Sequence, residues 1–164
     1  MLNKTTLFLI FICYSVLGQT SYRNLSSENW LFNKQGETKK HIATIPGTVH
    51  TDLFANQLIP DPFFGANEKQ LQWIENENWE YETTFSLSEK EISNENIELE
   101  FEGLDTYATV YINGKIVLEA DNMFRKWIVS AKSKLNRIIL MKHFLLLMLA
   151  MPIPYLKIIT ILVF

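Results

Sequence analysis

The fold of this chain is decided by residues 79–87, which read WEYETTFSL. Bulky apolar side chains alternate there with Glu, Thr and Ser, so successive residues face opposite sides of an extended strand. The same period of two returns at residues 97–102, which read IELEFE. Both runs are typical of antiparallel strands with one buried face and one solvated face. They predict an all-β protein.

Further short strands are expected on both sides of these two runs. Asn113-Gly114 separates two β-rich stretches, and this dipeptide is the strongest short signal for a hairpin because both residues accept positive φ. Many short strands with few helices predict a β-sandwich, most simply a jelly roll. The other strands are expected at residues 30–33, 41–44, 106–112, 115–119 and 124–131, and residues 88–95 are interpreted as a polar connection.

Two short helices interrupt the strand pattern. Thr48 is a good N-cap for a helix over residues 49–56, which Pro60 and Pro62 then terminate. A second helix is expected over residues 67–73.

The first residues resemble a secretory signal peptide. Lys4 precedes a short apolar core at residues 7–17, and small residues precede Gln19, so cleavage is expected after residue 18. An uncleaved anchor helix is the alternative, although the apolar run is short for a bilayer. The one cysteine of the chain, Cys13, lies in this segment. We therefore expect an exported protein, periplasmic or secreted, with a sandwich domain at residues 19–136.

Residues 137–164 differ in character from the domain before them. They contain no acidic residue and form two apolar runs split by Pro152 and Pro154. We interpret them as an aberrant tail, produced by a shifted reading frame, that leaves the last strand of the sandwich missing or improvised. A weak membrane association of this tail is the alternative, because the runs are short for a span.

The charge and motifs narrow the classes of function. A net charge of −3 does not favour nucleic-acid binding. His41 and His50 lack partners at metal-ligand spacing, and no glycine-rich phosphate loop occurs, so no metal and no cofactor is expected. The glutamates of residues 89–102 alternate with apolar residues and are interpreted as a solvated strand face.

A carbohydrate site is the remaining hypothesis, because sugars combine apolar CH faces with rigid hydroxyl groups. Trp79 is interpreted as a core residue at the start of its strand. Core packing is the alternative for Trp73, helix capping for Asn67, and an ordinary turn for the cluster at residues 121–125. The candidate binding residues are Asn67, Trp73, Asp121, Asn122 and Arg125.

Three stretches resemble the opening domain of β-mannosidases, in family 2 of the glycoside hydrolases. They read PGTVHTDL at residues 46–53, IPDPFF at residues 59–64 and DNMFR at residues 121–125. The resemblance covers roughly residues 29–135. It implies a galactose-binding-like jelly roll that packs against a separate (β/α)₈ barrel, which carries the two catalytic glutamates of a retaining exo-glycosidase acting on terminal β-linked mannose.

The resemblance assigns no catalytic residue to this chain. The barrel and the Trp-Asp-Trp-Gly-Pro motif of the family do not occur in the sequence, so we interpret the chain as truncated and expect it to hydrolyse nothing alone. The resemblance implies only that Asp121, Asn122 and Arg125 lie in a loop that faces the barrel. Alternatives from other classes are a free-standing carbohydrate-binding module and a membrane-tethered interaction domain.

Overall fold

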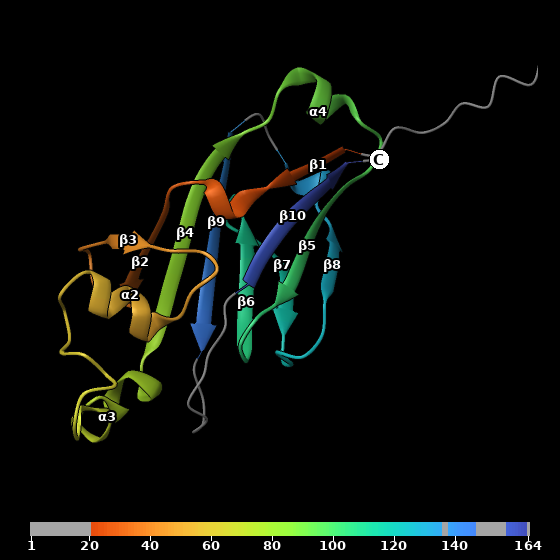
Figure 1. Ribbon diagram of the computed structural model, residues 1–164. Helices are drawn as coiled ribbons and strands as arrows, with labels where there is room; N and C mark the ends of the chain where they lie inside the picture. The colour runs from red at the N-terminus through yellow and green to blue at the C-terminus, as the bar shows by residue number, and fades with distance from the viewer. Residues whose placement is uncertain (1–20, 136–137, 147–156, 164) are drawn as a thin grey trace, which may run out of the picture.

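The computed structural model describes residues 21–135, 138–146 and 157–163. Its strands form two antiparallel sheets that face each other (Figure 1). The four-stranded sheet has the order β1-β10-β5-β8, and the six-stranded sheet has the order β3-β2-β4-β9-β6-β7. The strands are β1 (Ser21–Asn24), β2 (Trp30–Lys34), β3 (His41–Ala43), β4 (Asn78–Ser86), β5 (Ile97–Gly103), β6 (Tyr107–Ile112), β7 (Lys115–Ala120), β8 (Trp127–Ser130), β9 (Ile138–Leu146) and β10 (Lys157–Val163).

The apolar residues that alternate with polar ones in the sequence are the residues buried in the structure. In β4 the residues Trp79, Tyr81, Thr83 and Phe85 are buried, while their neighbours are half-buried or exposed. In β5 the apolar residues face the core, and Glu98, Glu100 and Glu102 are half-buried or exposed. The predicted all-β jelly-roll sandwich is confirmed.

The hairpin between β6 and β7 has the predicted turn. Asn113 has a φ of 49° and Gly114 a φ of 76°. Both values lie in the left-handed region, which these two residue types tolerate better than others.

The helices follow the prediction in part. Helix α2 (Val49–Ala55) is preceded by the predicted N-cap Thr48, whose hydroxyl accepts a hydrogen bond from the Thr51 backbone N–H. The second helix is shorter than expected, because α3 (Asn67–Gln70) is followed by a 3₁₀ helix at Gln72–Asn76. A third helix, α4 (Glu89–Ser93), lies within the segment expected to be a plain connection. Two further 3₁₀ helices occupy Leu25–Ser27 and Lys132–Lys134.

The segment interpreted as an aberrant tail supplies two strands. Strand β9 lies between β4 and β6 in the six-stranded sheet, and β10 lies between β1 and β5 in the other. The expectation that the last strand is missing or improvised therefore differs from the structure, where both strands occupy interior positions. The physical reason is that a period of two is required only where one sheet face is wet, so its absence does not exclude a strand. Residues 147–156 and the proposed signal peptide lie outside the described residues.

Candidate functional site

Three connections gather at one end of the sandwich, which we call the loop end. Strands β4 and β6 are both antiparallel to β9, and their first residues, Asn78 and Tyr107, both pair with Leu146. These two residues therefore begin their strands at the same end, about 10 Å apart, because strands are spaced by roughly 4.8 Å. Strand β7 is antiparallel to β6 and ends there too. The loop end thus comprises residues 56–77, 104–106 and 121–126, at the bottom of Figure 1.

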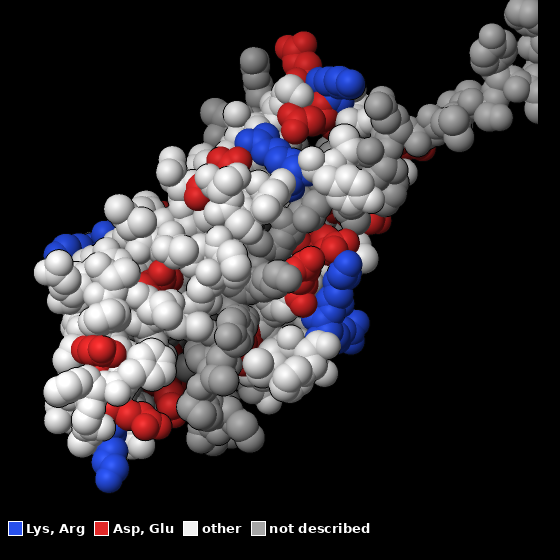
Figure 2. All heavy atoms as spheres, in the orientation of Figure 1, with Lys and Arg blue, Asp and Glu red and all other residues white. Residues whose placement is uncertain are grey.

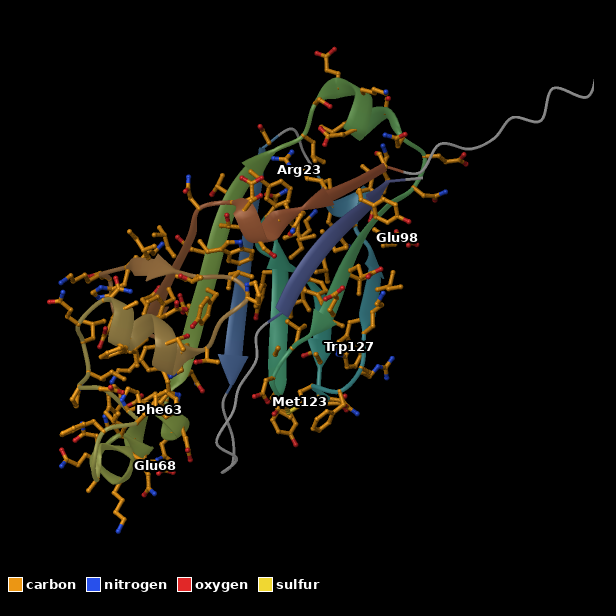
Figure 3. The ribbon with its side chains drawn as sticks, in the orientation of Figure 1. Arg23, Phe63, Glu68, Glu98, Met123 and Trp127 are labelled. Atoms are coloured by element: carbon orange, nitrogen blue, oxygen red, sulfur yellow. The ribbon has the colours of Figure 1, made fainter. Side chains whose placement is uncertain are left out.

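All five candidate residues lie at the loop end. Asn67 and Trp73 come from the segment before β4, and Asp121, Asn122 and Arg125 come from the connection between β7 and β8. Figure 3 shows the two groups apart, with Phe63 and Glu68 beside α3 and with Met123 below the end of β7. The structure brings the candidates to one end of the fold, as two clusters.

The loop at residues 121–126 is held by its own hydrogen bonds. The Asn122 side-chain oxygen accepts from the Phe124 backbone N–H at 2.8 Å, and the Trp127 indole N–H donates to the Asn122 carbonyl at 3.2 Å. The Arg125 guanidinium carbon lies 3.9 Å from the centre of the Trp127 ring. Phe124 is 89% exposed. The loop therefore presents an aromatic ring to solvent from a fixed backbone.

The first cluster also combines an amide with aromatic rings. The Asn67 side chain donates to the Asp61 carbonyl at 2.9 Å. The helix-capping alternative for Asn67 is wrong, because Ala66 is the N-cap of α3 and no side chain caps it. The Trp73 ring lies 6.2 Å from the Trp79 ring and is 42% exposed. Phe63, in the same segment before β4, is 93% exposed.

Trp79 is a core residue, as the sequence analysis predicted. It is 3% exposed, and its indole N–H donates to the Ile74 carbonyl at 3.1 Å. Trp73 therefore rests on a fixed support, and its outer surface remains available to a ligand.

Sequence reasoning included Phe124 in the cluster at residues 121–125 without choosing it as a binding residue, and it missed Tyr107 and Trp127 on the strands that border the loop end. Tyr107 is exposed because Ala108 and its alternate neighbours face the core. The period of two in β6 was the signal that could have found it. The sequence predicted a strand over residues 124–131, which placed Phe124 inside it. The observed strand β8 begins three residues later, at Trp127, so Phe124 lies in the loop.

Two titratable residues, one before the loop end and one within it, have shifted pKa values. Burial lowers the pKa of His50, and the nearby Glu75 partly opposes this shift. Burial raises the pKa of Asp105, and a hydrogen bond from Thr106 opposes it. Among the described residues, no three His, Cys, Asp or Glu side chains form a group that could hold a metal ion.

The visible surface carries charges of both signs. Figure 2 shows acidic and basic side chains scattered over one face, and several of them lie side by side. The ion pair between Lys126 and Glu100 has a distance of 2.6 Å. Within the described ranges, no helix combines the length and apolarity that a membrane crossing requires.

The geometry is that of an antiparallel β-sandwich with exposed aromatic and amide side chains on the loops at one end. Residues 30–155 match the sequence profile described as "Glycosyl hydrolase 2 galactose-binding domain-like". The chain belongs to this family of galactose-binding-like domains in glycoside hydrolase family 2. The match extends into the segment that was interpreted as aberrant.

Curated relatives carry the name β-mannosidase. A probable β-mannosidase of Caenorhabditis elegans is 36% identical over 117 residues, which are 71% of this chain and 13% of the relative. β-mannosidase B of Emericella nidulans is 37% identical over 106 residues, which are 62% of this chain and 12% of the relative. The chain therefore spans about an eighth of the length of these proteins. The resemblance to β-mannosidases is confirmed.

Solved structures agree with the sequence comparison. The crystal structure of a β-D-mannosidase from Dictyoglomus thermophilum superposes with a TM-score of 0.74 and 40% identity, over 76% of this chain and 15% of that one. An exo-chitosanase of Amycolatopsis orientalis superposes with a TM-score of 0.64 at 15% identity, over 74% of this chain and 16% of that one. The second likeness concerns the fold alone.

Proposed function

We propose that this domain forms one rim of the substrate site of a β-mannoside-hydrolysing enzyme, and that its loop end contacts the sugar. The single observation that carries this proposal is the convergence of Asn67, Trp73, Asp121, Asn122 and Arg125 on one end of the sandwich. The names of the relatives supply the substrate class, a β-mannoside.

The loop end offers the groups that a sugar requires. A pyranose ring has apolar CH faces, which pack on exposed aromatic rings such as those of Trp73 and Phe124. Its hydroxyl groups need donors and acceptors at fixed positions. Asp121 offers a carboxylate, and Arg125 offers guanidinium donors whose plane is oriented by the stack on Trp127.

Bond cleavage is assigned to a different domain. A retaining glycosidase needs two carboxyl groups about 5 Å apart across the sugar. The glutamates of β5 instead lie on the outer face of their sheet, where Lys126 neutralises Glu100. The partner of the loop end in this proposal is a catalytic (β/α)₈ barrel, in keeping with the family resemblance.

The proposal includes export. Residues 1–18 act as a signal peptide, so the mature protein is periplasmic or secreted. Amino-terminal sequencing of the exported protein is expected to begin at Gln19, and a product that retains Met1 would contradict export with cleavage.

Calorimetric titration of the purified chain with methyl β-D-mannoside tests the sugar-binding part. We expect a dissociation constant on the order of millimolar, which corresponds to about 4 kcal/mol. Trp73→Ala should weaken binding several-fold. Tyr22→Ala is the matched control, because Tyr22 is also an exposed aromatic residue but lies on β1, paired near the opposite end of the sandwich. Equal binding by both variants would contradict the assignment.

A further inference from the structure

The loop at residues 121–126 rests on the connection between β5 and β6. A Cβ atom built on Gly103 would lie 3.3 Å from the carbonyl oxygen of Met123, which is closer than side-chain carbons normally approach. A side chain at position 103 would therefore require the Met123 carbonyl to move by a few tenths of an ångström. The absence of a side chain at this position allows the backbone of the loop at residues 121–126 to approach the end of β5 closely.

Thr106 makes the second contact. Its hydroxyl oxygen lies 4.0 Å from the sulfur of Met123, and its proton is donated to the Asp105 carboxylate. Asp105 itself is 9% exposed, so the threonine hydroxyl is bonded to a partner that is largely shielded from solvent. The Met123 side chain thus packs against a fixed polar pair beneath the loop.

The other sides of the loop are held as well. Trp127 donates to the Asn122 carbonyl, and Lys126 pairs with Glu100 of β5. Met123 lies between these two contacts, in the middle of the loop (Figure 3). Its neighbours along the chain include Asn122 and Arg125, two of the candidate sugar-binding residues. A displacement of Met123 therefore changes the backbone positions of Asn122 and Arg125, which are one and two residues away.

We propose that Gly103 and Thr106 are positioning residues, which hold Met123 and thereby fix Asn122 and Arg125 in the orientation that binds a β-mannoside. This inference rests on the proposed function. A loop that is ordered before the ligand arrives loses less conformational entropy on binding, so its rigidity contributes directly to affinity. Neither residue touches the sugar in this arrangement.

The backbone dynamics of the loop give a readout that a general loss of stability would not produce. Amide order parameters of Asn122 and Phe124 should be about 0.85 in the wild-type chain, and they should fall below about 0.6 in Gly103→Ala and Thr106→Val. The amide of Val110, in the core of β6, should keep its value in both variants. Thr106→Ser retains the hydroxyl and should restore the loop. Thr109→Val removes a hydroxyl from β6, the strand that follows Thr106, at a position away from the loop, and is the matched control.

The affinity for methyl β-D-mannoside completes the test. Gly103→Ala and Thr106→Val should bind about fivefold to tenfold more weakly than the wild type, whereas Thr106→Ser and Thr109→Val should bind normally. An unchanged loop and unchanged affinity in the first two variants would overturn the positioning role while leaving the proposed function intact. A wild-type chain that binds no β-mannoside would overturn the proposed function and this inference together. Loss of order at Val110 as well as at the loop would show a general structural role and would also overturn the inference.

Discussion

The hydroxyl of Tyr81 on β4 donates a hydrogen bond of 3.0 Å to the carboxylate of Asp52 on α2. The other carboxylate oxygen accepts from the Thr44 backbone N–H at 2.9 Å. Asp52 is almost completely buried, and this burial raises its pKa to about 6, although both hydrogen bonds oppose the shift. This hydrogen bond connects α2 to the six-stranded sheet through the Asp52 carboxyl group, whose pKa is raised.

This pair predicts that Asp52 makes stability decline as the pH rises. Between about pH 4 and pH 6 the folded state binds more protons than the unfolded state, so the free energy of unfolding falls as Asp52 ionises. Two pKa units correspond to roughly 3 kcal/mol at most. Asp52→Asn removes this dependence and retains an acceptor for Thr44. Denaturant unfolding from pH 4 to pH 7 should show the wild type losing stability relative to the variant, and parallel curves would reject the prediction.

The aromatic core of the six-stranded sheet predicts a large difference between two phenylalanine positions. Phe32 is fully buried, and its ring stacks on Tyr81 with a centroid distance of 5.6 Å. Phe32→Ala should cost about 3–5 kcal/mol, through lost burial and the cavity left behind. Phe63→Ala, at an exposed position, should change stability by less than about 0.5 kcal/mol. Chemical denaturation measures both, and similar losses would contradict the assignment of the core.

The position of β9 predicts that its backbone is essential to the fold. Met141 pairs with Thr83 on one side and with Ile112 on the other. Met141→Pro removes a backbone donor in the interior of a sheet and should destabilise the chain by at least about 2 kcal/mol. Met141→Ala keeps the N–H and serves as the control. If the proline variant melts at the wild-type temperature, this segment is not part of the sandwich.

The assignment of catalysis to another domain predicts that the chain alone cleaves nothing. Purified protein incubated with p-nitrophenyl β-D-mannoside should release p-nitrophenol at the rate of buffer alone. Turnover that co-purifies with the chain, and that disappears on specific depletion of it, would require a catalytic pair within these residues.

Local patterns allowed much of the sandwich to be predicted from the sequence. The alternation around Trp79 and Tyr81 indicates which face of β4 is buried, because a strand has a period of two. Asn113-Gly114 identifies its hairpin for an equally local reason. Helix α4 was also within reach, since Ser88 and Glu91 form a capping box that can be recognised from spacing.

The features that escaped prediction depend on pairing between distant segments. Strand β9 lies between β4 and β6, and nothing in the local sequence of residues 138–146 indicates those neighbours. The same pairing brings Trp73 and Asp121 to one end of the molecule. The types of the site residues could therefore be proposed from the sequence, whereas their convergence and the support of Met123 by Gly103 could not.

A residue-resolved titration tests the central claim most directly. Backbone and side-chain amide resonances of the isotope-labelled chain are followed while methyl β-D-mannoside is added, with methyl α-D-mannoside as the comparison ligand. We expect saturable shifts at Asn67, Trp73, Asn122 and Arg125 with the β-anomer, and none at Tyr22. Shifts confined to other parts of the sandwich, or no shifts at millimolar sugar, would contradict the assignment of the loop end to β-mannoside binding.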